Sequence, residues 1–235
     1  MNGMNDESTD TRVNRRSILR GSVGGAAILA LPACASLPGF NLTEAIQRLL
    51  LLSSENAFAR MLAPDGFWDQ QVAGLGLNNL LGTSGGGVAS LLTSTLFKNR
   101  LEGVFADIAI DGSRVAAPIV ADAVRSMSIA DAAALVRGGP SAASELLRGQ
   151  LGGRLVEQMV PELGDAIRIA SDPLVAQLIN SAAGADIGGI AQRFAGNVDN
   201  AIWTEIGTEE AAIRADPQST GDPLLIGVFG AGSLF

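Results

Sequence analysis

The sequence predicts an all-α protein, a compact bundle of short capped helices behind a cleavable N-terminal signal segment. The chain has 235 residues, of which 47% are hydrophobic, so it is long enough to bury a sizeable core. Aromatic residues make up only 4% and tyrosine is absent, a balance that favours closely packed helices over an aromatic-rich sheet. Apolar residues also recur at helical spacing between residues that typically begin or end helices.

The first 33 residues are typical of an export signal. Arg15 and Arg16 precede the hydrophobic pair Ile18 and Leu19, and residues 21–33 form an apolar run with three glycines. This run is shorter than the ~20 residues that a helix needs to cross a bilayer, but it suits the hydrophobic region of a signal peptide. The stretch NRRSILR resembles the twin-arginine export signal. Residues 1–33 are therefore predicted to be a signal peptide.

Cys34 is the single cysteine of the chain and follows Leu31-Pro32-Ala33. This sequence resembles a bacterial lipobox, which implies that Cys34 becomes the first mature residue and carries acyl chains. Ala35 stands where inner-membrane lipoproteins often have Asp. The resemblance thus implies attachment to the periplasmic face of the outer membrane, through the lipid rather than through charge.

Two other interpretations of this segment stay open. Ala33-Cys34-Ala35 is also an A-x-A cleavage site, after which Ser36 would begin a soluble exported protein. The segment could instead form a buried N-terminal helix with a free thiol, although each glycine in a helix costs ~1 kcal/mol. A lone cysteine excludes an intramolecular disulfide under every interpretation.

The remaining chain is predicted to be a tether over residues 34–40, a single helical domain over 41–230 and a tail over 231–235. Asn41 begins the first helix, with Glu44 at capping-box spacing. Residues 63–66 form a turn by composition. The stretch 74–90 is rich in Gly, Asn and Ser and is predicted to be a loop; no lysine follows its glycines as phosphate binding would require.

Helix boundaries in the second half follow from caps and breakers. Residues 107–112 end in Asp-Gly and are predicted to be a turn after a helix, because a calcium loop would need further oxygen ligands. Ser128 is expected to cap a helix that ends at Gly138-Gly139-Pro140. Further helices are expected to begin at these residues: Ser141, Asp172, Asp186, Thr208 and Asp222. The one that begins at Asp186 is expected to end at Gly207.

Composition excludes several classes of function. Histidine is absent, which removes the usual proton shuttle, the Ser-His and Cys-His nucleophile pairs and the commonest metal ligand. The formal charge is −8, and the basic residues are scattered, so nucleic acid is not expected as a partner. No cofactor and no metal site are predicted.

The densest polar cluster lies near the C-terminus and consists of Glu209, Glu210, Arg214, Asp216 and Asp222. The structural interpretation is helix capping with a surface ion pair between Glu210 and Arg214, four residues apart. The chemical interpretation is an acid, base or cation site. We favour the structural interpretation and predict no catalytic residue.

The chain resembles the bacterial domain-of-unknown-function 4197 family of exported lipoproteins over roughly residues 42–230. The resemblance is carried by these motifs in this order: Pro64-Asp65-Gly66-Phe67, MSIADA at 127–132, the turn at 139–143, Pro161, EE..IR.DP at 209–217 and LL..VFG at 224–230. It implies export and an all-helical domain. It adds no catalytic residue, since the family has no established activity.

The expected function is a lipid-anchored envelope protein whose helical domain binds a partner protein or an apolar ligand without catalysis. The alternative is a hydrolase that uses the C-terminal carboxylates, although sugar-cleaving enzymes usually offer more aromatic side chains than the two Trp and eight Phe of this chain.

Overall fold

The computed structural model describes residues 41–64, 66–77, 79, 95–169, 173 and 187–230. Over these residues the chain forms helices and no strand, which confirms the all-α prediction. None of the helices within these ranges is long and apolar enough to span a bilayer. The predicted export signal, Cys34, the tether up to residue 40 and the tail over 231–235 lie outside the described residues, and the proposed domain boundaries stay a prediction.

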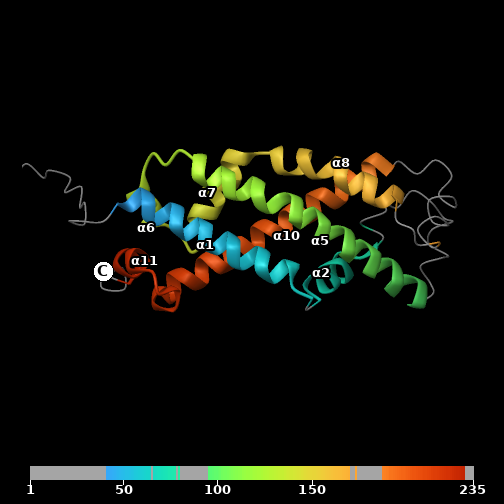
Figure 1. Ribbon diagram of the computed structural model, residues 1–235, viewed down its shortest axis with the longest axis horizontal. Helices are drawn as coiled ribbons and strands as arrows, with labels where there is room; N and C mark the ends of the chain where they lie inside the picture. The colour runs from blue at the N-terminus through green and yellow to red at the C-terminus, as the bar shows by residue number, and fades with distance from the viewer. Residues whose placement is uncertain are drawn as a thin grey trace, which may run out of the picture. The chain divides into compact units, whose positions relative to one another are not determined.

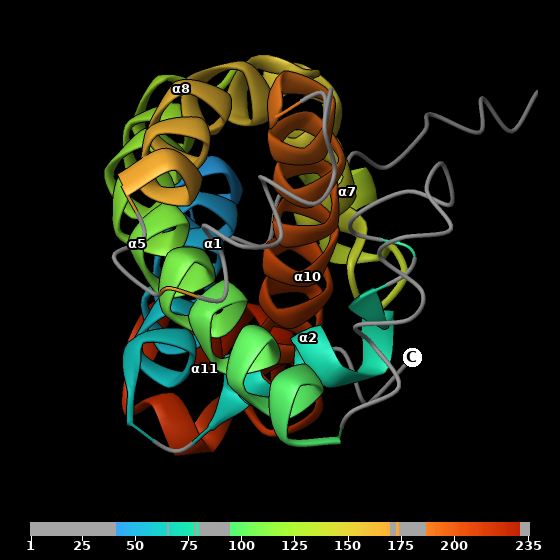
Figure 2. The same ribbon diagram turned by 90° about the vertical axis from the view of Figure 1, so that its right-hand side faces the viewer.

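Four long helices form the body of the protein: α1 (Leu42–Leu62), α5 (Thr95–Ser126), α8 (Arg154–Ile169) and α10 (Ile187–Ala215). Each packs most extensively against two others, in the cyclic order α1, α5, α8 and α10 (Figures 1 and 2). The shorter elements are α2 (Phe67–Leu75), α6 (Ala132–Val136), α7 (Ala142–Leu151), the 3₁₀ helix η1 (Pro217–Thr220) and α11 (Pro223–Phe229). The result is a four-helix bundle with short helices packed against it.

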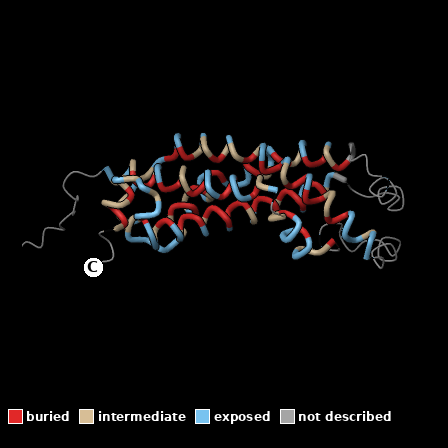
Figure 3. Tube along the Cα trace, turned by 60° about the horizontal axis from the view of Figure 1, so that its bottom comes forward, coloured by how far each residue is buried: buried red, intermediate tan, exposed pale blue. Residues whose placement is uncertain are grey.

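The core lies along the inward faces of the long helices, where the buried residues follow one another in Figure 3. Its largest fully buried side chains include Leu49 of α1, Leu101 of α5, Leu163 of α8 and Phe194 of α10. Phe105 meets Phe194 edge to face, with ring centroids 5.1 Å apart. Burial of a side chain of this size contributes about 1.5–3 kcal/mol, so apolar burial accounts for the association of the four helices.

The start of α1 follows the local signals of the sequence. The Asn41 side chain accepts a hydrogen bond from the Glu44 backbone N–H at 3.2 Å, which confirms the predicted cap. Ile46, Leu49 and Leu50 are completely buried, as their spacing predicts. Here the sequence contains both the cap and the apolar face, so no distant residue is needed to predict the element.

The ends of the bundle can be assigned from contacts between α1 and the C-terminal part of the chain. Arg48, early in α1, pairs with Asp222, whereas Arg60, late in α1, pairs with Glu205 and Glu209. Helices α1 and α10 therefore run antiparallel. In Figure 1 the start of α1 and α11 lie at one end, and α2 and the start of α5 lie at the other.

The turn predicted at residues 107–112 is wrong, because α5 runs through it without interruption. A Cβ on Gly112 would lie 3.0 Å from Cδ2 of Leu163 in α8. Glycine is present at this position because two helices approach closely there, which the local sequence does not reveal. Pro118 also lies inside α5.

The predicted helix boundary at Gly207 and Thr208 is wrong for a similar reason. Helix α10 continues to Ala215, and a Cβ on Gly207 would lie 3.3 Å from the Ser141 Cβ. The Thr208 hydroxyl donates to the Thr204 carbonyl one turn earlier, at 2.8 Å. Thr208 thus sits in mid-helix, where its hydroxyl bonds backwards instead of capping.

Two smaller predictions, the cap at Ser128 and the start of the Gly-rich loop, need correction. The helix predicted after Asp172 cannot be compared with the structure. Asp131 rather than Ser128 caps α6, with its carboxylate accepting from the Ala134 N–H at 2.8 Å. The Gly-rich stretch does not begin as a loop, since Gly74 and Leu75 are the last residues of α2. Most of that stretch from residue 80 onward lies outside the described residues, and so does most of the helix predicted after Asp172.

Candidate functional site

Glu210 is the most deeply buried member of the predicted polar cluster, with no exposed surface. Its carboxylate accepts the backbone N–H groups of Ala143 at 3.1 Å and Ser144 at 2.7 Å, together with the Ser144 hydroxyl at 2.6 Å. These N–H groups belong to the first turn of α7, where no helical carbonyl can accept them. A carboxylate from α10 therefore caps the start of α7, at the positive end of its dipole.

Arg214 lies one turn after Glu210 and completes this arrangement. Its Nε and Nη2 atoms lie 2.8 and 2.7 Å from Glu210 Oε1. Its guanidinium also donates to the carbonyls of Leu135 and Val136 at 3.1 and 3.2 Å, in the last turn of α6. The guanidinium carbon lies 4.9 Å from the centroid of the Phe229 ring in α11, within the range of a cation–π contact.

We call Glu210, Arg214 and these contacts the Glu210–Arg214 junction. It joins α10 to the start of α7, the end of α6 and one face of α11. The predicted ion pair is present, but its predicted position on the surface is wrong, because the side chains of Arg214 and Glu210 are only 10% and 0% exposed. Sequence reasoning also missed Ser144, whose role depends on a residue 66 positions away.

Glu209 points to a different partner. It pairs with Arg60 of α1, which also pairs with Glu205 at 2.7 Å. The two carboxylates are almost buried, whereas the Arg60 side chain is half exposed. Burial raises the pKa of Glu205, and the charge of Glu209 adds to this effect while Arg60 opposes it. Arg60 thus forms ion pairs with two carboxylates where α1 meets α10.

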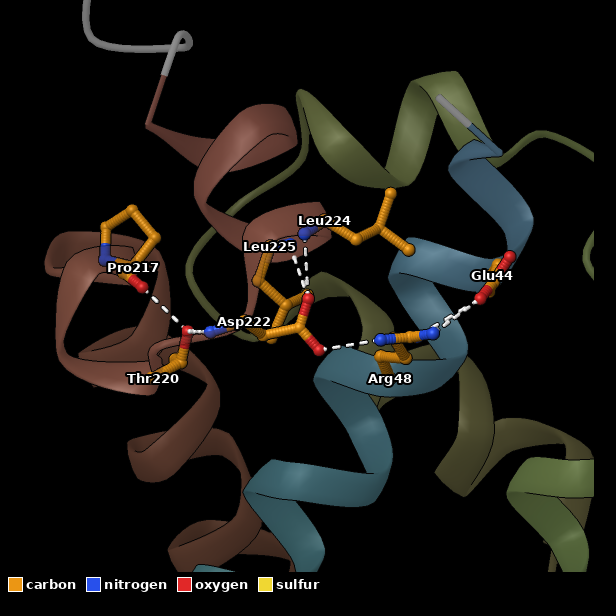
Figure 4. A network of polar contacts seen from close by, with 7 residues as sticks. All are labelled: Glu44, Arg48, Pro217, Thr220, Asp222, Leu224 and Leu225. Atoms are coloured by element: carbon orange, nitrogen blue, oxygen red, sulfur yellow. Dashed lines mark hydrogen bonds and ion pairs between the residues drawn. The ribbon is translucent and has the colours of Figure 1, made fainter. Parts of the chain in front are cut away.

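Asp222 caps α11 and pairs with α1 (Figure 4). Its carboxylate accepts the backbone N–H groups of Leu224 at 2.8 Å and Leu225 at 3.2 Å, and lies 2.9 Å from Arg48. Arg48 also pairs with Glu44 one turn earlier, at 2.8 Å. Burial alone would raise the pKa of Asp222, but the bonds from Arg48, Leu225 and Leu224 together lower it.

Asp216 is placed differently from the other four residues of the predicted cluster. It is exposed and precedes η1 without a side-chain cap, and its carbonyl accepts the Ser219 hydroxyl at 2.7 Å. The five predicted residues are thus distributed: Glu210 pairs with Arg214, Glu209 with Arg60 and Asp222 with Arg48. They do not point into one shared site.

A further buried polar group was not predicted. Asp199 of α10 is 7% exposed and accepts the Trp203 indole N–H at 2.9 Å and an Arg148 N–H at 3.0 Å. Burial raises the pKa of Asp199, and these two partners oppose the rise. The four-residue spacing of Asp199 and Trp203 was a usable signal for this contact, but nothing in the sequence indicates that Arg148 of α7 joins them.

The chemical capacity of these groups is limited. The Glu210 oxygens accept four groups of the protein itself, and the carboxylate has no exposed surface where a substrate could approach. Within the described ranges, no group of three or more His, Cys, Asp or Glu residues is arranged to hold a metal ion. The arrangement is suited to joining helices.

A family model described as "Protein of unknown function (DUF4197)" matches residues 36–230 of the chain. The chain belongs to the DUF4197 family. The match extends over every helix described above, so the Glu210–Arg214 junction and the other ion pairs lie within the family region of this DUF4197 protein. Comparison with curated proteins and with solved structures gave no match.

Proposed function

We propose that this DUF4197 protein is an exported, lipid-anchored envelope protein, located at the periplasmic face of the outer membrane. Its helical unit acts as a non-catalytic binding or structural module for a partner protein or an apolar ligand. The burial of Glu210 carries the non-catalytic part of this proposal, because the cluster most suited to acid–base chemistry by sequence uses its charges to connect helices.

The anchor rests on the N-terminal sequence. Arg15 and Arg16, the short apolar run and Leu31-Pro32-Ala33-Cys34 together favour export followed by acylation of Cys34. Several acyl chains, each worth ~0.8 kcal/mol per buried CH₂, would hold the chain firmly despite its formal charge of −8. A twin-arginine signal also suits a bundle that folds before export.

Mass spectrometry of the mature N-terminus tests the anchor. The expected result is a chain that begins at an acylated Cys34 and fractionates with outer membranes, and a Cys34→Ser variant should lose both properties. An unmodified chain that begins at Ser36 and fractionates with soluble periplasmic proteins would refute the anchor.

Glu210→Gln tests the non-catalytic assignment. We expect this variant to lose thermal stability, because the junction depends on the negative charge. A matched Glu162→Gln variant on the exposed side of α8, away from the ends of that helix, should keep wild-type stability. If Glu210→Gln instead keeps wild-type thermal stability but no longer produces the cellular phenotype of the wild-type protein, the carboxylate hydrolase would be favoured.

Affinity purification of the full-length lipoprotein from detergent-solubilised envelopes tests the binding role. The purified material is analysed both by protein mass spectrometry and by lipid extraction, with envelopes from cells that carry the untagged protein as the control for contaminants. We expect a protein or an apolar molecule in stoichiometric amount. Recovery of neither at normal expression would contradict the proposal.

A further inference from the structure

We infer that the helical unit stands with one particular end toward the bilayer: the end formed by the start of α1 and by α11. This inference rests on the proposed acylation of Cys34. Beyond the anchor itself, the inference names the surface of the described helices that faces the membrane and the surfaces that remain accessible to a partner.

The length of the tether limits how far α1 can lie from the bilayer. An extended chain spans at most about 3.6 Å per residue, so the seven steps from Cys34 to Asn41 reach about 25 Å. No further slack is available after Asn41, because its side chain caps α1 directly. The first turn of α1 is therefore within about 25 Å of the acylated residue, however the tether is folded.

The Glu44–Arg48–Asp222 network brings α11 to the same end. Arg48 lies in the second turn of α1 and pairs with the residue that caps α11, as Figure 4 shows. Its positive charge is matched by Glu44 and Asp222, so this network presents no excess positive charge to anionic lipid. The tether, rather than electrostatic attraction, would set the orientation.

The opposite end of the bundle lies about one helix length beyond the first turn of α1. Helix α1 has 21 residues and is therefore about 30 Å long. The start of α5 lies at the far end of α1 (Figure 1), and Asn99 is exposed there. The sides of the bundle and this far end are then the surfaces open to other envelope components.

Energy transfer to headgroup-labelled lipid tests the orientation. Donor dyes are placed by maleimide chemistry on Thr43→Cys or Asn99→Cys in the full-length lipoprotein, and each variant is reconstituted in vesicles of phosphatidylethanolamine and phosphatidylglycerol with a small fraction of acceptor-labelled lipid. Both positions are exposed. Acylation of Cys34 blocks its own thiol, so unsubstituted protein should take up no dye.

We expect markedly greater transfer from position 43 than from position 99. Insertion of a ten-residue Gly-Ser segment after Ser36 should lower transfer from position 43 and reduce the difference. Equal transfer from the two positions, or greater transfer from position 99, would overturn the orientation while leaving the anchor intact. A chain that begins at Ser36 by mass and does not associate with vesicles would overturn the anchor, and the orientation with it.

Discussion

The Glu210–Arg214 junction and the Arg48–Asp222 pair use the same chemistry in different surroundings. Each joins an arginine to a carboxylate that also caps a helix, with nitrogen–oxygen distances of 2.7 and 2.9 Å. The side chains of Arg214 and Glu210 are 10% and 0% exposed, whereas those of Arg48 and Asp222 are 47% and 22% exposed. An exposed pair typically contributes 0–1 kcal/mol, but breaking a buried pair costs about 3–5 kcal/mol. Burial rather than pairing distance therefore decides how much each contact contributes.

Removal of one partner from the junction should have the largest effect. Arg214→Met leaves the Glu210 charge buried without its counterion and leaves two α6 carbonyls without donors. We expect the free energy of unfolding to fall by about 3–5 kcal/mol, measured by urea denaturation followed by circular dichroism. Glu210→Gln combined with Arg214→Met should cost less than the sum of the single changes. A loss below about 1 kcal/mol, within the range of exposed pairs, would show that the junction is no stronger than the Arg48–Asp222 pair.

The glycine beside the junction should distinguish close packing from helix propensity. Gly207→Val adds a branched side chain against Ser141 and should cost about 1–3 kcal/mol. Gly196 lies in the same helix, and a Cβ there would meet nothing within 4 Å, so Gly196→Ala should gain up to about 1 kcal/mol from helix propensity. Gly207→Ala should gain less than Gly196→Ala. Equal gains in chemical denaturation would mean that α10 and α7 do not need glycine at this contact.

Substitutions at Asp222 should separate its capping role from its ion pair. Asp222→Ala removes both and should cost about 0.5–2 kcal/mol, chiefly through the lost cap. Asp222→Asn keeps a capping side chain, so it should cost less than about 1 kcal/mol. The effect of Asp222→Asn should also shrink at high salt, because an exposed pair is screened. If thermal unfolding shows that Asp222→Asn destabilises the protein as much as Asp222→Ala does, the ion pair contributes more to stability than its exposure indicates.

The pH dependence of stability should have opposite signs at two carboxylates, with the smallest effects of this series. The folded-state pKa of Asp222 is lowered, so its contribution is present above the unfolded pKa and is lost as pH falls through the folded pKa. The folded-state pKa of Glu205 is raised, so its contribution is largest below its ordinary pKa and declines as pH rises to the folded value. We therefore expect Asp222→Asn to weaken acid destabilisation, and Glu205→Gln to remove a loss of stability that develops above its ordinary pKa. Unfolding curves from about pH 3 to 7 measure both slopes. If the two substitutions change the wild-type slope of stability against pH in the same direction, the assignment is contradicted.

The sequence was most informative where structure depends on neighbouring residues. Asn41 and Asp222 were predicted as caps, and both bond to backbone N–H groups within three residues. The sequence also indicated which residues form the polar cluster, but it did not predict which partner each of them contacts. Glu209 and Glu210 are adjacent in α10 yet pair with arginines from different elements, and no local pattern indicates that Arg60 would be one of them.

The all-α class, the capped starts of several helices and the absence of histidine chemistry can be predicted from the residues alone, because they depend on composition and on contacts within one or two turns. The positions of Gly112 and Gly207 inside helices, and the burial of the Glu210–Arg214 pair, depend on packing between helices. In each case the deciding contact comes from another helix: Leu163 for Gly112, Ser141 for Gly207 and the α7 start for Glu210. The same residue types would end a helix or form a weak surface pair if those partners were absent.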